Sequence, residues 1–356
     1  MAKIEVLQHA LFNIDIDGNS VTRADLAGEK KDFAEFSNIM LTEILENEKS
    51  KQYEFTDNKE LVASHIQSFI KNDKINIDDT QDLDWEKRTE SIALKLLKEE
   101  ISAQEKIAAM DKKIKKGSLL LLLIEEDEIF RFVILKIDFD SFFDEIEARI
   151  RRGLPMNKNR LQKSCLITLS SDGEFESILI SDSGRTIREY WWSGFLSTRE
   201  LQSSELNTKN SYDAIDNVLR REVKKDYPSD YVYIRNDVNA YFRNNDNFSF
   251  PELIGKIEKH KSDHSDLQDK LPSIIAKLKV LPVNPRAPFD TQFDLSISVI
   301  KNRIRSVIFL DDQIELRIKA DVPNLKHKIK AEKDDDGKYI KIYTDKGYEI
   351  FGGKEE

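Results

Sequence analysis

The sequence predicts an α+β protein, in which an N-terminal antiparallel sheet packed with helices precedes a helical region and a small C-terminal antiparallel β module. The first observation is a set of apolar runs of strand length that come in two pairs, each pair separated by a short polar turn. These runs are Leu119–Ile124, Ile129–Ile137, Cys165–Leu169 and Phe175–Ile180. The second observation is a change of period, because Ile187, Trp191 and Phe195 recur at helical spacing. Two hairpins and a helix that lays aromatic rings on them form the expected core.

The other N-terminal elements follow from the same two periods. In chain order we expect strands over Ile4–Ile16 and Val21–Leu26, a helix from Asp32, a short helix over 61–70, a polar loop over Asn72–Leu83, and a long helix from about Asp84 to Lys113. The apolar residues of the long helix have a heptad-like spacing. That spacing suits packing on the sheet or on a second copy of the chain.

A polar link over Ser197–Lys209 leads to a second region with a different composition. Its expected elements are helices over 212–225, 231–244 and 250–261, an extended passage with Pro282, Pro285 and Pro288, and strands over Phe293–Val299, Ser306–Leu310, Ile314–Ala320 and Tyr339–Thr344 that form one small sheet. The expected domains are therefore 1–208 and 209–356, the second with a helical segment over 209–280 and a β module over 286–351. Its short helices could contain a helix-turn-helix, although no clear turn and recognition helix marks one.

Composition limits the classes of function. The 356 residues carry a net charge of −10, and 34% of them are charged. No apolar run is long enough for a bilayer and the first residues lack a signal-peptide pattern, so a cytoplasmic protein without membrane contact is expected. Cys165 is the single cysteine, which excludes an intramolecular disulfide. Its position within a strand favours a buried thiol over a nucleophile.

The most unusual segment lies between the two hairpins and is rich in cations. No acid interrupts the run of Arg149, Arg151, Arg152, Lys158, Arg160 and Lys163. Gly153 and Pro155 break any helix, so we expect a flexible loop over 149–163 that is either solvated or in contact with a phosphate backbone. A second basic surface is expected in the β module, from Lys301, Arg303, Arg305, Lys326, His327, Lys328 and Lys330. Net acidity does not oppose such local patches, because salt screens charges beyond about 8–10 Å.

The common catalytic signatures do not occur in this sequence. It has no phosphate-binding glycine loop, zinc-protease pair or nucleophile elbow, and no cofactor is expected. His260 and His264 have helical spacing, but their charged surroundings favour exposed polar side chains over a metal site. Asp138 and Asp140 lie at a strand end and could hold Mg²⁺ for phosphodiester cleavage, although capping of a local turn is the simpler interpretation. The sequence favours a protein that is not an enzyme.

Three stretches carry a resemblance to a known family. They are GRTIREYWWSGFLSTRELQSSELNTK over Gly184–Lys209, IEVLQHALFNI near the start, and FDLSISVIKNRIRSVIFLDDQIELRIKADVPNLKHKI near the end. Together they resemble the bacterial nucleoid-associated proteins of the YejK/NdpA type. The resemblance implies a nucleoid location, a role in chromosome organisation, binding to double-stranded DNA with little sequence preference, and contact with a type II topoisomerase. It brings no catalytic residues, but Arg185, Arg188 and Lys209 fall within the matching stretch and are candidates for DNA contact or for surface salt bridges.

Three hypotheses from different classes follow. The first is a non-enzymatic, homodimeric protein of the nucleoid that binds double-stranded DNA through phosphates on basic loops. The second is a protein-interaction or DNA-sensing subunit of an anti-phage defence system, or a modulator of a topoisomerase. The third is a metal-dependent nuclease that uses Asp138 and Asp140.

Overall fold

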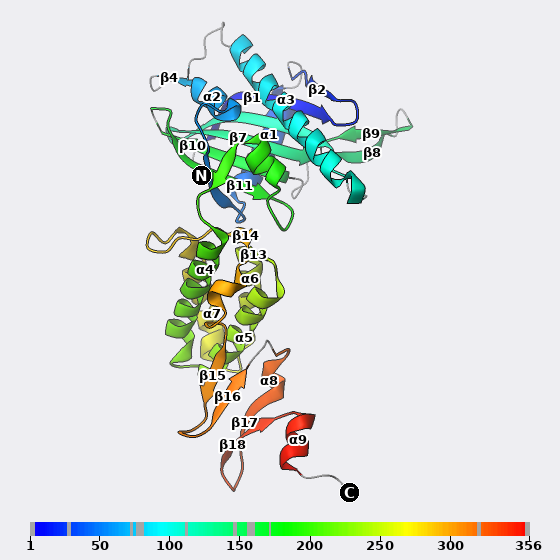
Figure 1. The fold of residues 1–356 in the computed structure, drawn as a ribbon. Coiled ribbons are helices and arrows are strands. Elements are labelled where there is room, and N and C mark those ends of the chain that lie inside the picture. Colours follow the sequence, from blue (N-terminus) through cyan, green and yellow to red (C-terminus); the bar gives the residue numbers. More distant parts are fainter. Residues whose placement is uncertain are drawn as a thin grey trace. The chain divides into compact units, whose positions relative to one another are not determined.

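The protein has an α+β fold, which a computed structural model describes for residues 4–26, 30–71, 74–75, 82–110, 113–144, 148–154, 161–170, 172–318 and 322–352 (Figure 1). The chain divides into two compact units. Unit 1 comprises Met1–Ser203 and Asp290–Phe293, and unit 2 comprises Ser204–Phe289 and Asp294–Glu356. The sequence placed the division after residue 208, whereas unit 2 begins at Ser204 and a short later segment returns to unit 1.

Unit 1 is built on an eight-stranded sheet with the order β12-β3-β11-β10-β7-β6-β1-β2 and antiparallel neighbours throughout. In chain order its strands are β1 (Ile4–Asp15), β2 (Ser20–Arg23), β3 (Lys51–Phe55), β6 (Gly117–Glu126), β7 (Ile129–Asp138), β10 (Leu161–Leu169), β11 (Phe175–Asp182) and β12 (Thr198–Glu200). Both predicted hairpins are present. The turn between β6 and β7 has positive φ at Asp127 (50°) and Glu128 (67°), as a tight two-residue turn requires.

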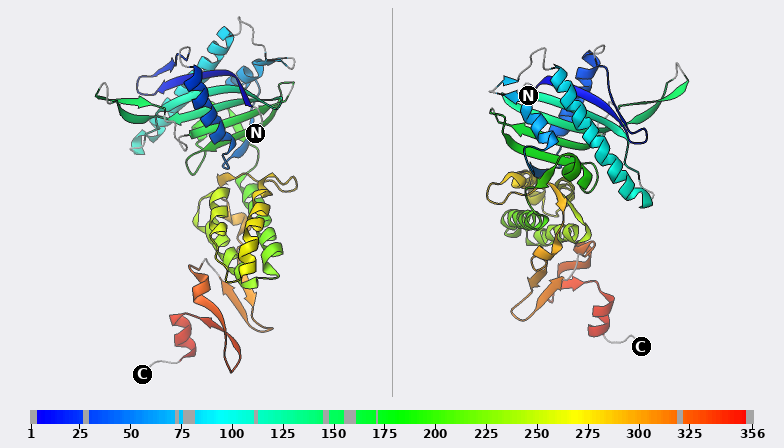
Figure 2. Two further views of the ribbon diagram at one scale, coloured as in Figure 1. Left: turned by 180° about the vertical axis from the view of Figure 1, so that it is seen from behind. Right: turned by 45° about the horizontal axis from the view of Figure 1, so that its top comes forward.

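The sheet is apolar on both faces, which explains why its central strands are continuous apolar runs. Leu119, Leu121 and Leu123 pack on one face, and the alternate residues of β6 pack on the other. The first face is covered by α2 (Leu61–Ser68), α3 (Asp82–Ile107, followed by the short turn Ala108–Met110) and the π-helical turn η2 (Tyr190–Phe195). Helix α1 (Lys30–Leu45) lies across the opposite face, as Figures 1 and 2 show.

Two small strand pairs complete the described part of unit 1. They are β4 (Ile70–Lys71) with β5 (Lys74–Ile75), and β8 (Asp140–Asp144) with β9 (Arg149–Gly153). The predicted loop over Asn72–Leu83 lies largely outside the described residues, although β5 falls within it and α3 begins before its end. No helix among the described residues is long and apolar enough to cross a membrane.

Unit 2 begins with a group of helices: α4 (Ser204–Leu219) with the π-helical turn η3 (Arg220–Lys224), α5 (Pro228–Asn244), α6 (Phe250–Glu258) and α7 (Ser265–Lys279). The polar link expected over Ser197–Lys209 is wrong in its second half, because Asn207 and Thr208 are buried residues of α4. Helix α7 was not expected from the sequence. Its buried Leu267, Leu271, Ile274 and Leu278 have helical spacing despite the internal Pro272.

The C-terminal part of unit 2 contains two separate two-stranded pairs rather than one small sheet. In chain order its elements are η5 (Ile297–Ile300), β15 (Ser306–Phe309), β16 (Glu315–Ile318), α8 (Leu325–Lys328), β17 (Ile329–Lys333), β18 (Lys338–Ile342) and α9 (Asp345–Phe351). Earlier in the chain are the turn Leu281–Val283 and the short strand β13 (Asn247–Ser249), together with β14 (Gln292–Asp294), whose first two residues belong to unit 1. The strand predicted over Phe293–Val299 is therefore wrong beyond Asp294, where the chain forms a 3-10 turn.

Candidate nucleic-acid interface

The cationic segment predicted as a loop is partly a strand. Arg149, Arg151 and Arg152 belong to β9, which pairs with β8, and Figures 1 and 2 show this two-stranded arm extending past the edge of the main sheet. Aromatic and β-branched residues in both strands favour this hairpin over the expected flexible loop. Arg149 is exposed. Lys158 and Arg160 lie outside the described residues, as do the side chains of Arg151 and Arg152.

Lys163 lies in the interior, whereas the sequence suggested that it faces solvent. It belongs to β10, directly opposite Asp182 of β11, and its Nζ is paired with the Asp182 carboxylate. The same carboxylate accepts hydrogen bonds from the backbone N–H groups of Gly184 (2.8 Å) and Arg188 (3.3 Å). Burial lowers the pKa of Lys163, with Asp182 opposing that shift. We therefore exclude Lys163 from the candidate phosphate contacts.

The stretch that carries the family resemblance is mainly structural. Trp191 and Phe195 are fully buried against the sheet, and Tyr190 lies beside the buried Glu100 of α3. Arg185 and Arg188 are exposed in unit 1, whereas the exposed Lys209 belongs to α4 of unit 2. The three proposed contacts within this stretch are thus divided between two units.

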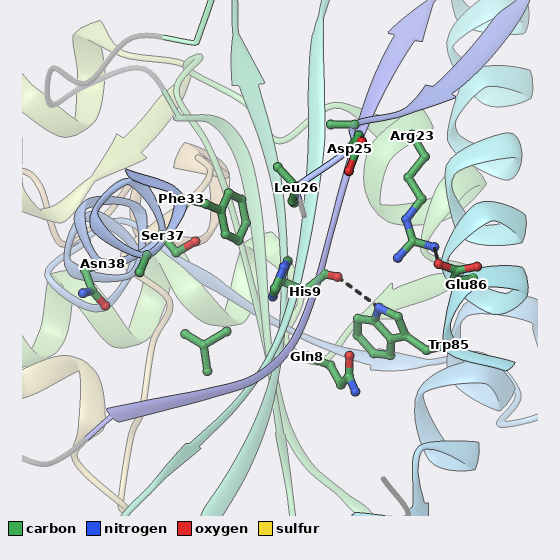
Figure 3. A pocket seen from close by; sticks show the side chains of 13 residues that line it. Gln8, His9, Arg23, Asp25, Leu26, Phe33, Ser37, Asn38, Trp85 and Glu86 are labelled. Carbon is green, nitrogen blue, oxygen red and sulfur yellow. Dashed lines mark hydrogen bonds and ion pairs between the residues drawn. The ribbon is translucent and has the colours of Figure 1, made fainter. Parts of the chain in front are cut away.

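A hollow of about 800 Å³ in unit 1 is formed by β1, α1, α3 and the residues after β2 (Figure 3). Its polar groups bind one another, because Arg23 forms an ion pair with Glu86 (2.9 Å) and the Trp85 indole donates to the His9 carbonyl (3.1 Å). Burial and the nearby Arg23 lower the pKa of His9, which disfavours a positive charge on its ring. Arg23 is outnumbered by the lining acids Asp25 and Glu86. This hollow is unsuited to a phosphate.

The structure offers little to a catalytic metal ion. Asp138 forms an ion pair with Lys115 (3.2 Å), and the Asp140 side chain lies outside what the structure describes. His264 is exposed as expected, whereas the His260 side chain is largely buried, and both rings bind the buried carboxylate of Asp230, at 3.0 and 2.7 Å. Within the described residues, no group of three histidine, cysteine or acidic side chains could hold a metal ion.

A strongly cationic hollow lies among the described residues of unit 2, and we name it the Arg groove. It has a volume of about 700 Å³ and five cationic lining residues, with no acid among the residues that line it. The cations are Arg220 and Lys224 of η3, Arg235 of α5, Arg305 before β15, and Arg317 of β16. Apolar and aromatic side chains form the rest of its wall: Tyr231, Val232, Val307, Ile308 and Phe309, with Pro228 and Asn302 beside them.

A single carboxylate organises one wall of the Arg groove. Asp216 of α4 accepts hydrogen bonds from Arg220 (2.8 Å), Arg235 (2.9 Å) and the Tyr231 hydroxyl (3.0 Å). It is nearly buried, so its charge lies behind the arginines and not in the hollow. The two guanidinium groups are therefore held in place with part of their charge still directed outward.

The opposite wall is fixed by hydrogen bonds to backbone carbonyls. Arg235 donates to the carbonyl oxygens of Arg303 (2.6 Å) and Arg305 (3.4 Å), while Asn239 and Arg243 donate to that of Ile304 (3.2 and 2.8 Å). These bonds hold the segment before β15 against α5, although it has no regular secondary structure. They fix the backbone from which the Arg305 side chain extends.

The Arg groove keeps an excess of positive charge after its ion pairs are counted. Asp216 offsets part of the charge of Arg220 and Arg235, and Glu315 pairs with Arg317 at 2.5 Å. Lys224 lies over the Tyr231 ring, 5.7 Å from its centroid, and neither Lys224 nor Arg305 forms an ion pair with the described residues. Five cations against two acids leave a local net charge of +3.

Sequence analysis identified only Arg305 of this set. The other cations are scattered over almost a hundred residues, and nothing in their local spacing indicates that they meet. No protein-family model matches this chain, and no curated protein matches it either. The functional assignment therefore rests on the geometry of the Arg groove.

Proposed function

We propose that this protein is a non-enzymatic DNA-binding protein with little sequence preference, which contacts phosphate groups through the Arg groove. The observation that carries the proposal is the convergence of five cations from four segments of unit 2 on one hollow without a lining acid. Arginine suits this role because its planar guanidinium binds phosphate oxygens in pairs. Contacts of this kind position a protein on DNA without reading the bases.

The acidic character of the whole chain does not oppose this proposal. The net charge of −10 is spread over all 356 residues, whereas phosphates in the groove would meet a local charge of about +3. Salt screens exposed charges beyond about 8–10 Å, so distant carboxylates contribute little at the groove. The positive potential of such a patch attracts an anionic polymer to one face of the protein and not to the rest of its surface.

The arm formed by β8 and β9 is a second candidate contact in unit 1. A two-stranded ribbon fits the major groove of duplex DNA, and this arm carries three arginines on one strand. Contacts from both units would increase affinity through effective concentration. A nucleoid location and a role in chromosome organisation would follow from affinity for bulk DNA, and a homodimer would double the number of contacts.

The test is equilibrium binding of the full chain to a fluorescent random-sequence duplex between 50 and 200 mM salt. Each phosphate neutralised contributes about 0.9 to the slope of log affinity against log salt, or roughly a 3.5-fold loss over this range. The double variant Lys224→Ala/Arg305→Ala should bind more weakly at low salt, and its slope should fall by about 1.8. The control Lys277→Ala/Lys279→Ala removes two exposed cations from α7, outside the groove, and should match the wild type.

Two outcomes would contradict the proposal. Equal affinities and equal slopes for the groove variant and the wild type would exclude the Arg groove as the phosphate contact. No binding at 50 mM salt would reject the proposed binding to double-stranded DNA.

A protein-interaction subunit is the second candidate, and one observation favours it. The C-terminal helix α9 exposes Phe351 to 92% and Ile350 to 75%, which is unusual for large apolar side chains. The partner would be a protein, such as a topoisomerase or a component of anti-phage defence. Co-purification of one defined protein from nuclease-treated extract would support this candidate, and its loss in Ile350→Ser/Phe351→Ser would assign the contact to α9.

A further inference from the structure

We infer that the Arg groove binds single-stranded nucleic acid in preference to duplex, with a base stacked on Phe309 and phosphates on the surrounding cations. This inference rests on the proposed function and names the form of nucleic acid that the groove takes. The observation behind it is the distribution of apolar and charged groups within the groove. Three consecutive residues of β15, Val307, Ile308 and Phe309, line the groove together with the five cations.

Phe309 is unusually exposed for a residue that lines a groove. Its side chain is 77% accessible, and that of Val307 is 40% accessible. Val307 and Phe309 are alternate residues of β15, so they lie on the same face of the strand. Nothing in the described structure covers this face at Phe309, and burial of an aromatic ring is among the larger apolar gains available to a binding site.

The hairpin register places an acid directly opposite the aromatic ring and a cation diagonally from it. Val307 is directly opposite Arg317 of β16, and Phe309 is opposite Glu315. Directly opposed residues of a strand pair share a face, and diagonal neighbours remain within reach of long side chains. Arg317 is the diagonal neighbour of Phe309, so a base on the ring and its phosphate on the guanidinium can be bound together.

A duplex can place its phosphates on the cations of the groove, but it cannot stack a base on Phe309. Its bases are stacked on one another, and its surface presents phosphates and groove edges. Phosphates over Phe309 and Val307 would lose water without gaining hydrogen bonds from those side chains, which is costly for a charged group. A single strand exposes both its base faces and its phosphates, and proteins bind it by combining an aromatic platform with a cationic groove.

The acidic turn of the same hairpin limits the path of the strand. Asp311 and Asp312 lie at exposed positions between β15 and β16 and would repel phosphates. The strand should therefore leave Phe309 toward Arg317 and Arg305 rather than over the turn. This path keeps the phosphates beside the cations of the groove.

Three fluorescent ligands of equal length separate the contributions: oligo-dT, the same strand with abasic sites, and a duplex. The full-length wild type should bind oligo-dT most tightly. Phe309→Ala should weaken oligo-dT binding by roughly 5- to 150-fold, the effect expected from the loss of one stacked base, and leave the abasic strand and the duplex unchanged. Phe351→Ala removes an even more exposed ring elsewhere in unit 2 and should have no effect on oligo-dT binding. Arg305→Ala should weaken binding of all three ligands.

The outcomes separate this inference from the proposed function. Equal affinities for oligo-dT and duplex, or a Phe309→Ala effect of the same size on the abasic strand, would overturn the single-strand inference and leave DNA binding intact. Failure of all three ligands to bind the wild type would reject both. Because Phe309 is largely exposed, its variant should fold normally, and an unchanged circular dichroism spectrum and thermal midpoint will verify this.

Discussion

The ion pair between Lys136 of β7 and Glu100 of α3 allows a quantitative test of how unit 1 is held together. Both side chains are fully buried, with an accessibility of 0% each. Lys136 lies on the same face of the sheet as Phe132 and Ile134, directly beneath α3. Burial lowers the pKa of Lys136 and raises the pKa of Glu100, while each partner opposes the shift of the other.

Lys136→Met should destabilise unit 1 strongly, because it leaves Glu100 buried without a counter-charge. Removal of one partner from a buried pair costs about 3–5 kcal/mol. For a unit in the class of 150–250 residues, each kcal/mol shifts the thermal midpoint by about 2–4 °C, so a fall of roughly 6–20 °C is expected. The unpaired Glu100 can relieve part of this cost by binding a proton. A carboxyl group whose folded-state pKa is raised destabilises the folded protein as pH rises. The Lys136→Met variant should therefore have a smaller free energy of unfolding at pH 8 than at pH 5.5.

The assay is thermal unfolding for the midpoint and urea unfolding for the free energy, both followed by tryptophan fluorescence. All three tryptophans of the chain, Trp85, Trp191 and Trp192, belong to unit 1, so the signal reports this unit alone. The double variant Lys136→Met/Glu100→Leu should recover the wild-type midpoint or exceed it, because well-packed apolar pairs often replace buried ion pairs without loss. Arg199→Met breaks an exposed pair with Glu54 and should cost less than about 1 kcal/mol. A Lys136→Met cost as small as that of Arg199→Met would refute the reasoning.

Two further predictions concern titratable groups of unit 1. Burial is the main cause that lowers the pKa of His65, and Arg88 donates to its Nδ1 (3.2 Å), which requires an unprotonated ring nitrogen. Because its folded-state pKa is depressed, the stability that His65 contributes is present above its unfolded pKa of about 6.5 and is lost as pH falls through the folded value. The urea midpoint should therefore drop between pH 7.5 and 5 more in the wild type than in His65→Gln; equal drops would contradict this. Burial raises the pKa of the Cys165 thiol, so it should react with a thiol reagent only after urea unfolding, and rapid labelling of the native protein would refute its burial.

The strands of unit 1 could be predicted because their signals are local. Each central strand is an apolar run that ends at a turn, and Gly173, between β10 and β11, has the positive φ (83°) that a tight turn requires. Helix α7 was not predicted, although its apolar residues keep their helical spacing on both sides of Pro272. Burial of the apolar face of α7 against the surrounding helices contributes more to the stability of this helix than the hydrogen bond that the proline removes.

The functional residues were harder to predict, because the sequence does not show whether a charged side chain faces solvent or the interior. The residues next to Lys163 in the sequence are typical of those around an exposed cation. In the structure, strand pairing places Lys163 opposite Asp182, inside the protein. Arg220 and Arg235 are ordinary helix residues in the sequence and become one surface only through Asp216. Such sites depend on contacts between residues that are distant along the chain, which local periodicity does not encode.

Asp216 also shows why a count of charges is a poor guide to this surface. A count of formal charges predicts that an acid next to a candidate phosphate site weakens phosphate binding there. In the structure this acid is nearly buried, and it holds Arg220, Arg235 and the Tyr231 hydroxyl in one arrangement. A guanidinium that is already ordered loses less side-chain entropy when it binds a phosphate. The carboxylate therefore reduces the formal charge of the groove by one, and in return it preorganises two of the five cations on which binding depends.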